Sequence, residues 1–195
     1  MQISSVRIEN FRCVRELELD LDETTVLIGA NNAGKTAIME AIRIVLTRRW
    51  GQRGTGFTEY DVHCPGEAID PRAAPPVRVS LKFEEDPDEP WDPDMVAALE
   101  DQLVLSDQGA NLAALRVTCQ WSEEKEGFEP SWEFLDAAGQ PLTNKSQRAT
   151  NLSNFFGYAP LFYLPALRDA ADEFGARDLP PAGPSIIMRA QGVGS

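Results

Sequence analysis

The alternation of apolar and polar residues predicts strands over the first 30 residues. Ile3, Val6 and Ile8 mark an apolar segment. In residues 14–21, leucines alternate with acidic residues, and this period of two is typical of a half-buried antiparallel strand. After a polar turn, the continuous apolar run of residues 25–28 predicts a short strand that is buried on both faces.

The hydrophobic period changes after Gly34 and predicts a helix from about Lys35 to Thr47. Apolar residues then recur at helical spacing, while Glu40 and Arg43 lie off the apolar face. The apolar face consists of Ile38, Met39, Ile42, Val45 and Leu46.

The rest of the chain predicts further strands and helices separated by loops. The predicted elements are a loop or insertion at about 50–76, a strand over 77–83, a helix from Asp94 to about Leu105, strands over 112–121 and 131–136, a weak helix over 144–155 and a buried strand over 160–164. Residues 171–195 show no apolar period and no cap pattern, so we expect a poorly ordered tail there.

Composition indicates one ordinary globular unit. The chain has 195 residues, of which 43% are hydrophobic and 25% charged, enough for a core without disulfides or metals. It contains no run of 18 apolar residues and its first residues do not resemble a signal peptide, so we expect a cytoplasmic protein without a membrane span.

The charge is unevenly distributed. Residues 1–60 hold eight basic and eight acidic residues, so the whole net charge of −13 lies in residues 61–195. That surplus argues against DNA binding by this chain alone. The basic stretch of Arg48, Arg49 and Arg53 around Trp50 either contacts DNA phosphates or complements a helix C-terminus. The acidic residues 84–94 are typical of a solvated loop, with a divalent-metal site as the alternative.

Cysteine and histidine do not form a metal-binding pattern. Cys13, Cys64 and Cys119 are widely spaced, and His63 is the one histidine of the sequence. A zinc site needs three or four convergent ligands, so we expect reduced thiols and a surface histidine instead.

Residues 29–36 match the phosphate-binding pattern GxxxxGK[ST] at every fixed position. Glycines at both ends allow the loop to curl, so that backbone N–H groups face an anion at the positive end of the following helix. Lys35 would reach the β- and γ-phosphates of ATP, and the Thr36 hydroxyl would bind Mg²⁺. The alternative is a glycine-rich turn that binds nothing. The predicted nucleotide ligands are Gly29, Asn31, Asn32, Ala33, Gly34, Lys35 and Thr36.

The residues around this loop resemble a known family. Ile8-Glu9-Asn10-Phe11-Arg12, the NNAGKT form of the loop and the Glu40-Ala41 helix are similar to the start of ABC-type ATPases of the SMC/RecF group. They are most similar to the OLD (overcoming lysogenization defect) family of ATP-dependent nucleases. The segment from Phe162 to Asp169 resembles a second block of that family.

The resemblance implies roles for three further residues. Asn32 would lie beside the γ-phosphate. Arg12 would contact the nucleotide from the first strand-turn, or else be a surface arginine with a packed stem. Arg168 would sense phosphate or cap a strand end.

Several motifs of an intact enzyme are absent from this sequence. No segment has the four apolar residues and acidic pair of a Walker B strand, and neither an LSGGQ-like signature nor the carboxylates of a Toprim nuclease domain occur. We therefore expect residues 1–170 to be the N-terminal part of an ABC-type ATPase domain, which by itself binds ATP weakly and hydrolyses it negligibly.

The predicted fold class is α/β, a P-loop NTPase with an antiparallel β-subdomain. The resemblance implies the ATP-binding portion of an OLD-like, DNA-directed ATPase and endonuclease, with a role in phage or genome defence. The intact protein would form a homodimer through its ATPase head and would contact DNA. The alternatives are a regulatory or assembly module that needs a partner chain for hydrolysis, and, less well supported, a small P-loop kinase.

Overall fold

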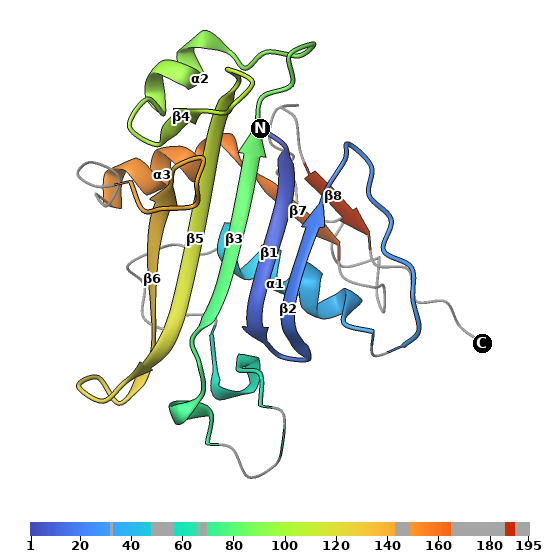
Figure 1. Ribbon diagram of the computed structural model, residues 1–195, viewed down its shortest axis with the longest axis vertical. Coiled ribbons are helices and arrows are strands. Elements are labelled where there is room, and N and C mark those ends of the chain that lie inside the picture. The colour runs from blue at the N-terminus through green and yellow to red at the C-terminus, as the bar shows by residue number, and fades with distance from the viewer. Residues whose placement is uncertain are drawn as a thin grey trace, which may run out of the picture.

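The fold was established from a computed structural model, which describes residues 1–31, 33–47, 57–64, 66, 70–142, 149–164 and 186–189. Within these residues, strands and helices follow one another in the order shown in Figure 1. They are β1 (Ile3–Phe11), β2 (Val14–Asp20), α1 (Lys35–Thr47), the 3₁₀ turns η1 (Glu59–Asp61) and η2 (Pro71–Ala73), β3 (Val77–Glu84), α2 (Pro93–Ala98), β4 (Leu103–Leu105), β5 (Asn111–Ser122), β6 (Gly127–Leu135), α3 (Ala149–Tyr158), β7 (Leu161–Leu164) and β8 (Ile186–Arg189).

The main sheet has six antiparallel strands in the order β2-β1-β3-β5-β4, and β6 also pairs with β5. β4 pairs with the first residues of β5, from Asn111 to Ala113, and β6 pairs with the remainder, so the two share one edge of that long strand. β7 and β8 form a separate parallel pair. The α/β class is confirmed, with the sheet on one side and α1 and α3 behind it (Figure 1).

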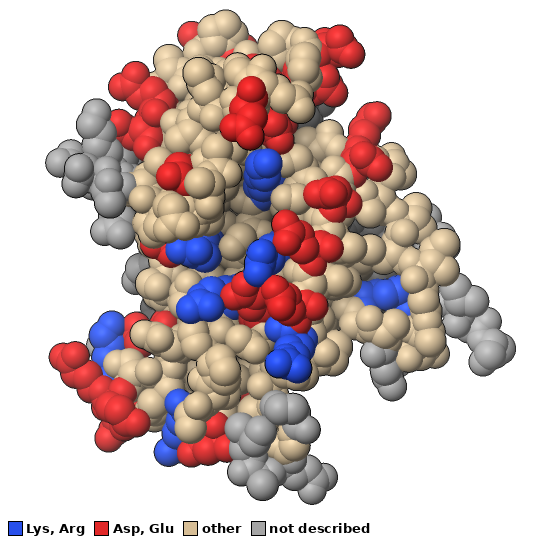
Figure 2. All heavy atoms as spheres, in the orientation of Figure 1, with Lys and Arg blue, Asp and Glu red and all other residues tan. Residues whose placement is uncertain are grey.

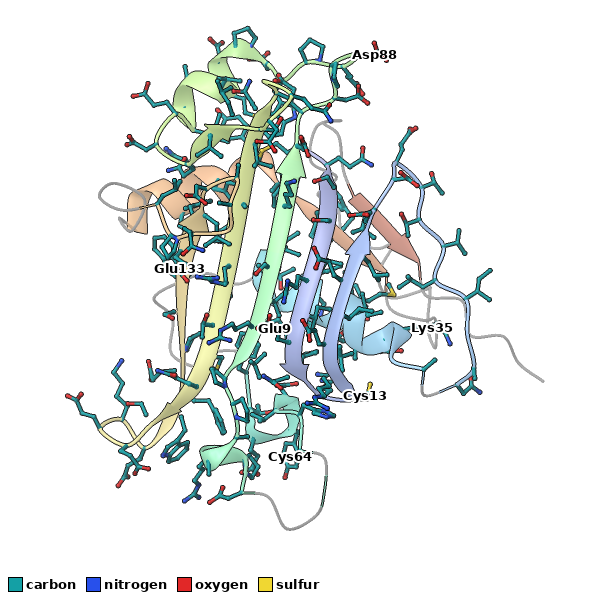
Figure 3. All side chains as sticks on the ribbon, in the orientation of Figure 1. Glu9, Cys13, Lys35, Cys64, Asp88 and Glu133 are labelled. Atoms are coloured by element: carbon teal, nitrogen blue, oxygen red, sulfur yellow. The ribbon has the colours of Figure 1, made fainter. Side chains whose placement is uncertain are left out.

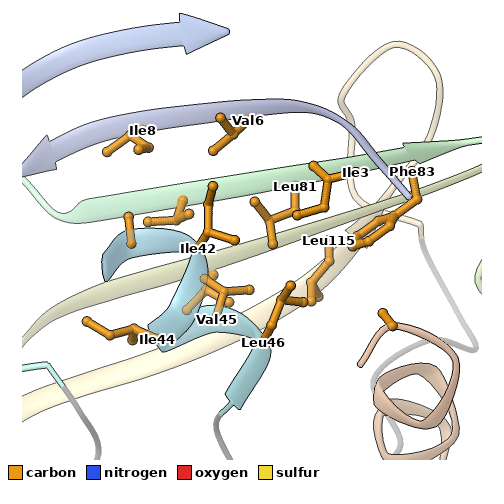
Figure 4. Close-up of a cluster of buried hydrophobic side chains, with 14 of the residues drawn as sticks. Ile3, Val6, Ile8, Ile42, Ile44, Val45, Leu46, Leu81, Phe83 and Leu115 are labelled. Atoms are coloured by element: carbon orange, nitrogen blue, oxygen red, sulfur yellow. The ribbon is translucent and has the colours of Figure 1, made fainter. Parts of the chain in front are cut away.

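One face of the sheet and one face of α1 form the core. In β1 and β3, alternate residues are buried, as the period-two pattern requires. The apolar face predicted for residues 35–47 packs onto these strands, and Ile42 and Val45 lie directly under them in Figure 4. The strand side of this cluster includes Ile3, Val6, Ile8, Leu81, Phe83 and Leu115.

The second helix on this face is fixed by aromatic packing. Phe155 of α3 is fully buried, and its ring lies edge-on to Phe83 of β3 and Phe134 of β6, with centroid distances of 5.3 and 5.1 Å. Such pairs add to the free energy gained from buried area. Helix α3 therefore belongs to the same core as the first strands.

The opposite face of the sheet carries paired charges. Arg7 of β1 forms ion pairs with Glu9, Glu16 and Glu18, and Arg116 of β5 pairs with Glu133 of β6. Figure 2 shows this face, where basic and acidic side chains lie side by side over the central strands. Exposed pairs of this kind contribute little to stability, but they leave this face without a basic surplus for DNA.

The sequence correctly predicted the strands at 3–8, 14–21, 77–83, 112–121 and 131–136 and the helix at 35–47. The expected loop at 50–76 contains η1 and η2 in its described residues. The weak helix predicted over 144–155 is α3, which begins at Ala149, and residues 143–148 lie outside the described part.

The strand predicted over residues 25–28 is wrong. Among the described residues this segment pairs with no strand, and Val26 and Ile28 are 72% and 90% exposed. Only Leu27 packs against the core. A strand buried on both faces needs strands to pair with and a packed layer over each face of the sheet, and no local sequence pattern can supply those neighbours.

Three other predictions need correction. The helix expected from Asp94 to Leu105 is α2, which Asp92 caps by accepting a hydrogen bond from the Asp94 N–H, and it ends at Ala98. The apolar residues after it form β4, because β5 offers them a free edge. The strand at 160–164 is β7, but Phe162 is 37% exposed. Of the expected poorly ordered tail, residues 171–185 and 190–195 lie outside the described residues, and residues 186–189 form β8.

The acidic loop after β3 is held together by its own carboxylates. Glu85 accepts hydrogen bonds from the backbone N–H groups of Trp91 and Asn111, and Asp86 accepts one from Asp88.

In the part of the chain that the structure describes, no helix is long and apolar enough to cross a membrane.

Glu85 makes the stability of this loop dependent on pH. The hydrogen bonds from Asn111 and Trp91 lower the pKa of Glu85 below its ordinary value of 4.5. A lowered pKa in the folded state stabilises the fold above the ordinary pKa, and this stabilisation is lost as the pH falls through the folded value. We expect Glu85→Gln to lower Tm at pH 7, and the difference from the unmodified chain to shrink below about pH 4. Thermal unfolding from pH 7 to pH 3 measures this, and a difference that does not depend on pH would contradict it.

Candidate nucleotide-binding site

The glycine-rich loop lies between the extended segment that follows β2 and the first turn of α1. Lys35 folds back over the loop and donates hydrogen bonds from Nζ to the carbonyl oxygens of Gly29 and Ala30, at 2.6 and 2.8 Å. The Ala33 N–H donates to the Ala30 carbonyl, which closes a turn within the loop. The ammonium group is thereby held at the N-terminus of a 13-residue helix, where the backbone dipoles favour an anion.

Two glycines allow this geometry. Gly34 has a φ of +88°, which residues with a Cβ rarely adopt, and a Cβ there would lie 3.4 Å from Cys13 Sγ. A Cβ on Gly29 would lie 3.3 Å from the Cβ of Ala33. The glycines of the motif are therefore required by the conformation of the loop and by its contact with the β1–β2 turn.

The β1–β2 turn lies next to the loop. Asn10 and Arg12 in this turn both have positive φ values, 56° and 50°, which places Cys13 against Gly34. Figure 3 shows Cys13 at the end of this hairpin, near the start of α1 that carries Lys35. The first two strands thus form one wall of the candidate site.

Residues 58–63 hold the strained turn in place. The His63 N–H donates to the Asn10 carbonyl and the Arg12 N–H donates to the Asp61 carbonyl, both at 2.9 Å. His63 Nδ1 lies 2.7 Å from the Arg12 carbonyl oxygen, and Val62 bridges to Phe11. His63 therefore stabilises the backbone of this turn through hydrogen bonds.

The same segment contributes a buried carboxylate. Asp61 is only 3% exposed, and its Oδ1 accepts a hydrogen bond from Arg12 Nε at 2.8 Å. Its Oδ2 accepts two more, from the backbone N–H and the hydroxyl of Thr58. A charge this deeply buried needs such partners.

A second charged group joins α1 to β7. Both carboxylate oxygens of Glu40 accept hydrogen bonds from Arg43, whose guanidinium lies 5.6 Å from the Tyr163 ring centroid. Burial on its own would raise the pKa of Glu40, but hydrogen bonds from Arg43 and Tyr163 lower it overall. Burial raises the pKa of Tyr163, and its hydrogen bond to Glu40 raises it further. The helix that carries Lys35 is thus fixed at its middle as well as at its start.

The donor groups fit a nucleotide phosphate. They are the backbone N–H groups of the glycine-rich loop, the N-terminus of α1 and the ammonium group of Lys35, which lies next to both. For Mg²⁺ the described residues offer the exposed Thr36 hydroxyl at the site, and no group of three His, Cys, Asp or Glu side chains among them could hold a metal ion. The metal would accordingly be held between Thr36 and phosphate oxygens.

The structure brings together most of the residues predicted to bind nucleotide. Gly29, Asn31, Ala33, Gly34, Lys35 and Thr36 lie in one loop, and the turn that carries Arg12 lies beside it. Asn32, Arg168 and the basic stretch around Trp50 lie outside the described residues. Sequence reasoning missed Asp61 and Thr58, because nothing in the sequence links residue 61 to residue 12. It also missed the Glu40–Arg43 pair, which the spacing of three residues on a predicted helix could have indicated.

Comparison with known proteins agrees with this geometry. A family model described as AAA ATPase domain matches residues 1–135. The chain is 26% identical over 192 residues to the OLD nuclease of Thermus scotoductus, which covers 96% of this chain and 30% of the relative. It is 30% identical over 70 residues to the endonuclease GajA of Bacillus cereus, or 36% of this chain and 12% of the relative. The predicted resemblance to OLD nucleases is confirmed.

A solved structure agrees in fold. It comes from a structural study of ATP-driven dimerization and DNA-stimulated activation of SMC ATPases, and it matches with a TM-score of 0.51 at 16% identity. The match covers 92% of each chain, which confirms the predicted ABC-type, SMC-like fold. The chain spans less than a third of the length of the OLD nuclease.

Proposed function

Since the chain belongs to the AAA ATPase domain family, we propose that it is the ATP-binding N-terminal portion of an OLD-like, DNA-directed ATPase and endonuclease. The observation that carries this proposal is the glycine-rich loop, in which Lys35 is held over the N-terminus of α1. The family match over residues 1–135 and the likeness to the OLD nuclease along almost the whole chain support it. Residues 1–170 would then be the N-terminal part of an ABC-type ATPase domain.

Each ligand has a role that follows from its chemistry. Backbone N–H groups of the loop from Gly29 to Gly34 bind phosphate oxygens. The resemblance to OLD nucleases implies that Asn32 would act beside the γ-phosphate. Lys35 neutralises the β- and γ-phosphates, and Thr36 binds Mg²⁺. Arg12 supplies a second cation from the neighbouring turn.

The partners proposed for the intact protein are a second copy of itself and DNA, with a role in phage or genome defence. The SMC structure that shares this fold comes from a study of ATP-driven dimerization and DNA-stimulated activation, which supports both partners. DNA contacts would be made by other parts of the intact protein, because this chain carries a net charge of −13. We place the protein in the cytoplasm.

A second candidate function is a regulatory or assembly module that hydrolyses ATP only with a partner chain. It is favoured by the absence from this sequence of an apolar strand followed by an acidic pair, the segment that positions Mg²⁺ and water in related ATPases. Both candidates share the nucleotide site and differ in where the remaining catalytic groups come from.

We expect the purified chain to bind ATP and ADP with Mg²⁺ but to show no AMP binding and negligible ATP turnover. Lys35 and the loop bind the β-phosphate, which AMP lacks, and the groups that activate water are missing. Isothermal titration calorimetry with the three nucleotides measures binding, and phosphate release measures turnover. An affinity for AMP equal to that for ATP and ADP would contradict the proposed nucleotide site. If the purified chain hydrolyses ATP appreciably and Lys35→Ala abolishes this hydrolysis, the expectation that hydrolysis needs further segments of the protein is wrong.

A further inference from the structure

We propose that Asp61 is a positioning residue, which orients the Arg12 guanidinium so that its two terminal nitrogens face the phosphates of a nucleotide in the glycine-rich loop. The proposal rests on the proposed function, because it assumes that the loop binds a nucleotide. It assigns a role to a buried carboxylate that lies 49 positions away from Arg12 in the sequence.

The place of Arg12 follows from its turn. The neighbouring residue Cys13 lies against Gly34, next to Lys35, so the Arg12 side chain starts close to the phosphate loop. Two backbone hydrogen bonds and one contact of the His63 ring hold Asn10 and Arg12 at positive φ values. Such backbone strain persists only where the surrounding structure fixes it.

The hydrogen bonds of Arg12 indicate how it is aimed. Asp61 accepts from Nε alone, which is the inner nitrogen of the guanidinium. In the described part of the chain, the two outer nitrogens donate no hydrogen bond, and the side chain is 36% exposed. A guanidinium held at Nε presents its remaining donors as a planar fork, and this geometry matches phosphate oxygens.

The environment of Asp61 indicates that its position is fixed independently of Arg12. Two hydrogen bonds from Thr58 hold Oδ2, so the carboxylate keeps its place while Oδ1 faces Arg12. Glu40, the other carboxylate near Arg12, has both oxygens engaged by Arg43. Asp61 is therefore the hydrogen-bonding group that directs the Arg12 side chain, and the Phe11 ring, whose centroid lies 5.0 Å from the guanidinium carbon, packs against it.

A double-mutant cycle on ATP affinity tests the proposal. The affinities of four chains for Mg·ATP are measured by calorimetry: the unmodified chain, Arg12→Ala, Asp61→Asn and the double variant. We expect Arg12→Ala to raise Kd about tenfold, as for the loss of one charge-assisted hydrogen-bonded contact. Asp61→Asn should raise Kd at least about threefold when Arg12 is present, and should have no further effect in the Arg12→Ala background.

Thr58→Val is the matched control. It removes the hydroxyl bond to Oδ2 but keeps the backbone N–H bond that holds this oxygen and the Arg12–Asp61 pair, so it should lower Tm without changing Kd. A purely structural Asp61 would instead raise Kd equally in both backgrounds, and that result overturns the proposal. If Asp61→Asn does not fold, Arg12→Lys decides, because an ammonium group bound to Asp61 does not present the planar fork of two further nitrogens that the proposal requires: reduced affinity supports the proposal and unchanged affinity overturns it.

Failure of the proposed function has a different signature. If the unmodified chain binds no ATP, or if Lys35→Ala binds it equally well, the proposed function fails and this inference fails with it. If ATP binds and Lys35→Ala weakens binding, but the cycle is additive, only the role of Asp61 is refuted.

Discussion

Lys35→Ala is expected to weaken Mg·ATP binding about 100-fold, which corresponds to about 2.7 kcal/mol. The substitution removes the ammonium group that lies over the loop and the hydrogen bonds that it would make to the β- and γ-phosphates. Hydrogen bonds to charged groups are worth about 1.5–3 kcal/mol each. In the free chain, Lys35 is bonded to two exposed loop carbonyls, so its loss should change Tm little. Calorimetry and thermal unfolding of the same sample separate the two effects.

Lys125→Ala is the control for charge alone. Lys125 lies in the turn between β5 and β6, where it pairs with Glu129 in a fully solvated position. Its removal changes the net charge of the chain by the same amount as Lys35→Ala, but should leave ATP affinity unchanged. An equal loss of affinity in both variants would indicate a general charge effect and would refute the assigned role of Lys35.

Phe155→Ala is expected to lower the free energy of unfolding by about 3–5 kcal/mol, the usual cost of removing a buried aromatic side chain. The ring lies between those of Phe83 and Phe134, so its loss opens a cavity where α3 meets the sheet. Urea unfolding followed by circular dichroism measures the change. Phe155 lies beyond the residues that the family model matches, so this variant tests whether α3 is part of the same cooperative unit.

Tyr158→Ala provides the comparison on the same helix. Its side chain is 37% exposed, while its backbone carbonyl accepts a bond from the N-terminal amine, which the substitution preserves. We expect a loss below about 1 kcal/mol. Equal and small losses in both variants would show that α3 does not pack as described.

The elements that sequence reasoning predicted well are those whose pattern is local and complete. The helix from Lys35 to Thr47 has a full apolar face and starts at a glycine, and its bounds agree with the structure. The strand at residues 77–83 alternates strictly because one face of the sheet is open to solvent. The run at 25–28 has equally strong strand character, but its conformation depends on neighbours that no local pattern specifies.

The residues of the candidate site likewise divide into those that a local pattern predicts and those whose positions depend on distant segments. The glycine-rich loop could be predicted because the spacing of Gly29, Gly34, Lys35 and Thr36 is the one that phosphate binding requires. The pairing of Arg12 with Asp61 could not, because it depends on a turn with positive φ values and on a segment that returns after the whole of α1. Asn10 is of a residue type that often adopts positive φ, but Arg12 is not, and Asn10 alone does not mark such a turn in a sequence.

The exposed segment that holds Val26 and Ile28 continues directly into Gly29, the first residue of the phosphate loop. Among the described residues its backbone pairs with no strand, and it thus leaves an edge to which another strand could add. If such pairing ordered the adjoining phosphate loop, it would change ATP affinity, and ATP would change the affinity of the added strand by the same factor. A strand that paired there would then act on ATP affinity without contacting ATP.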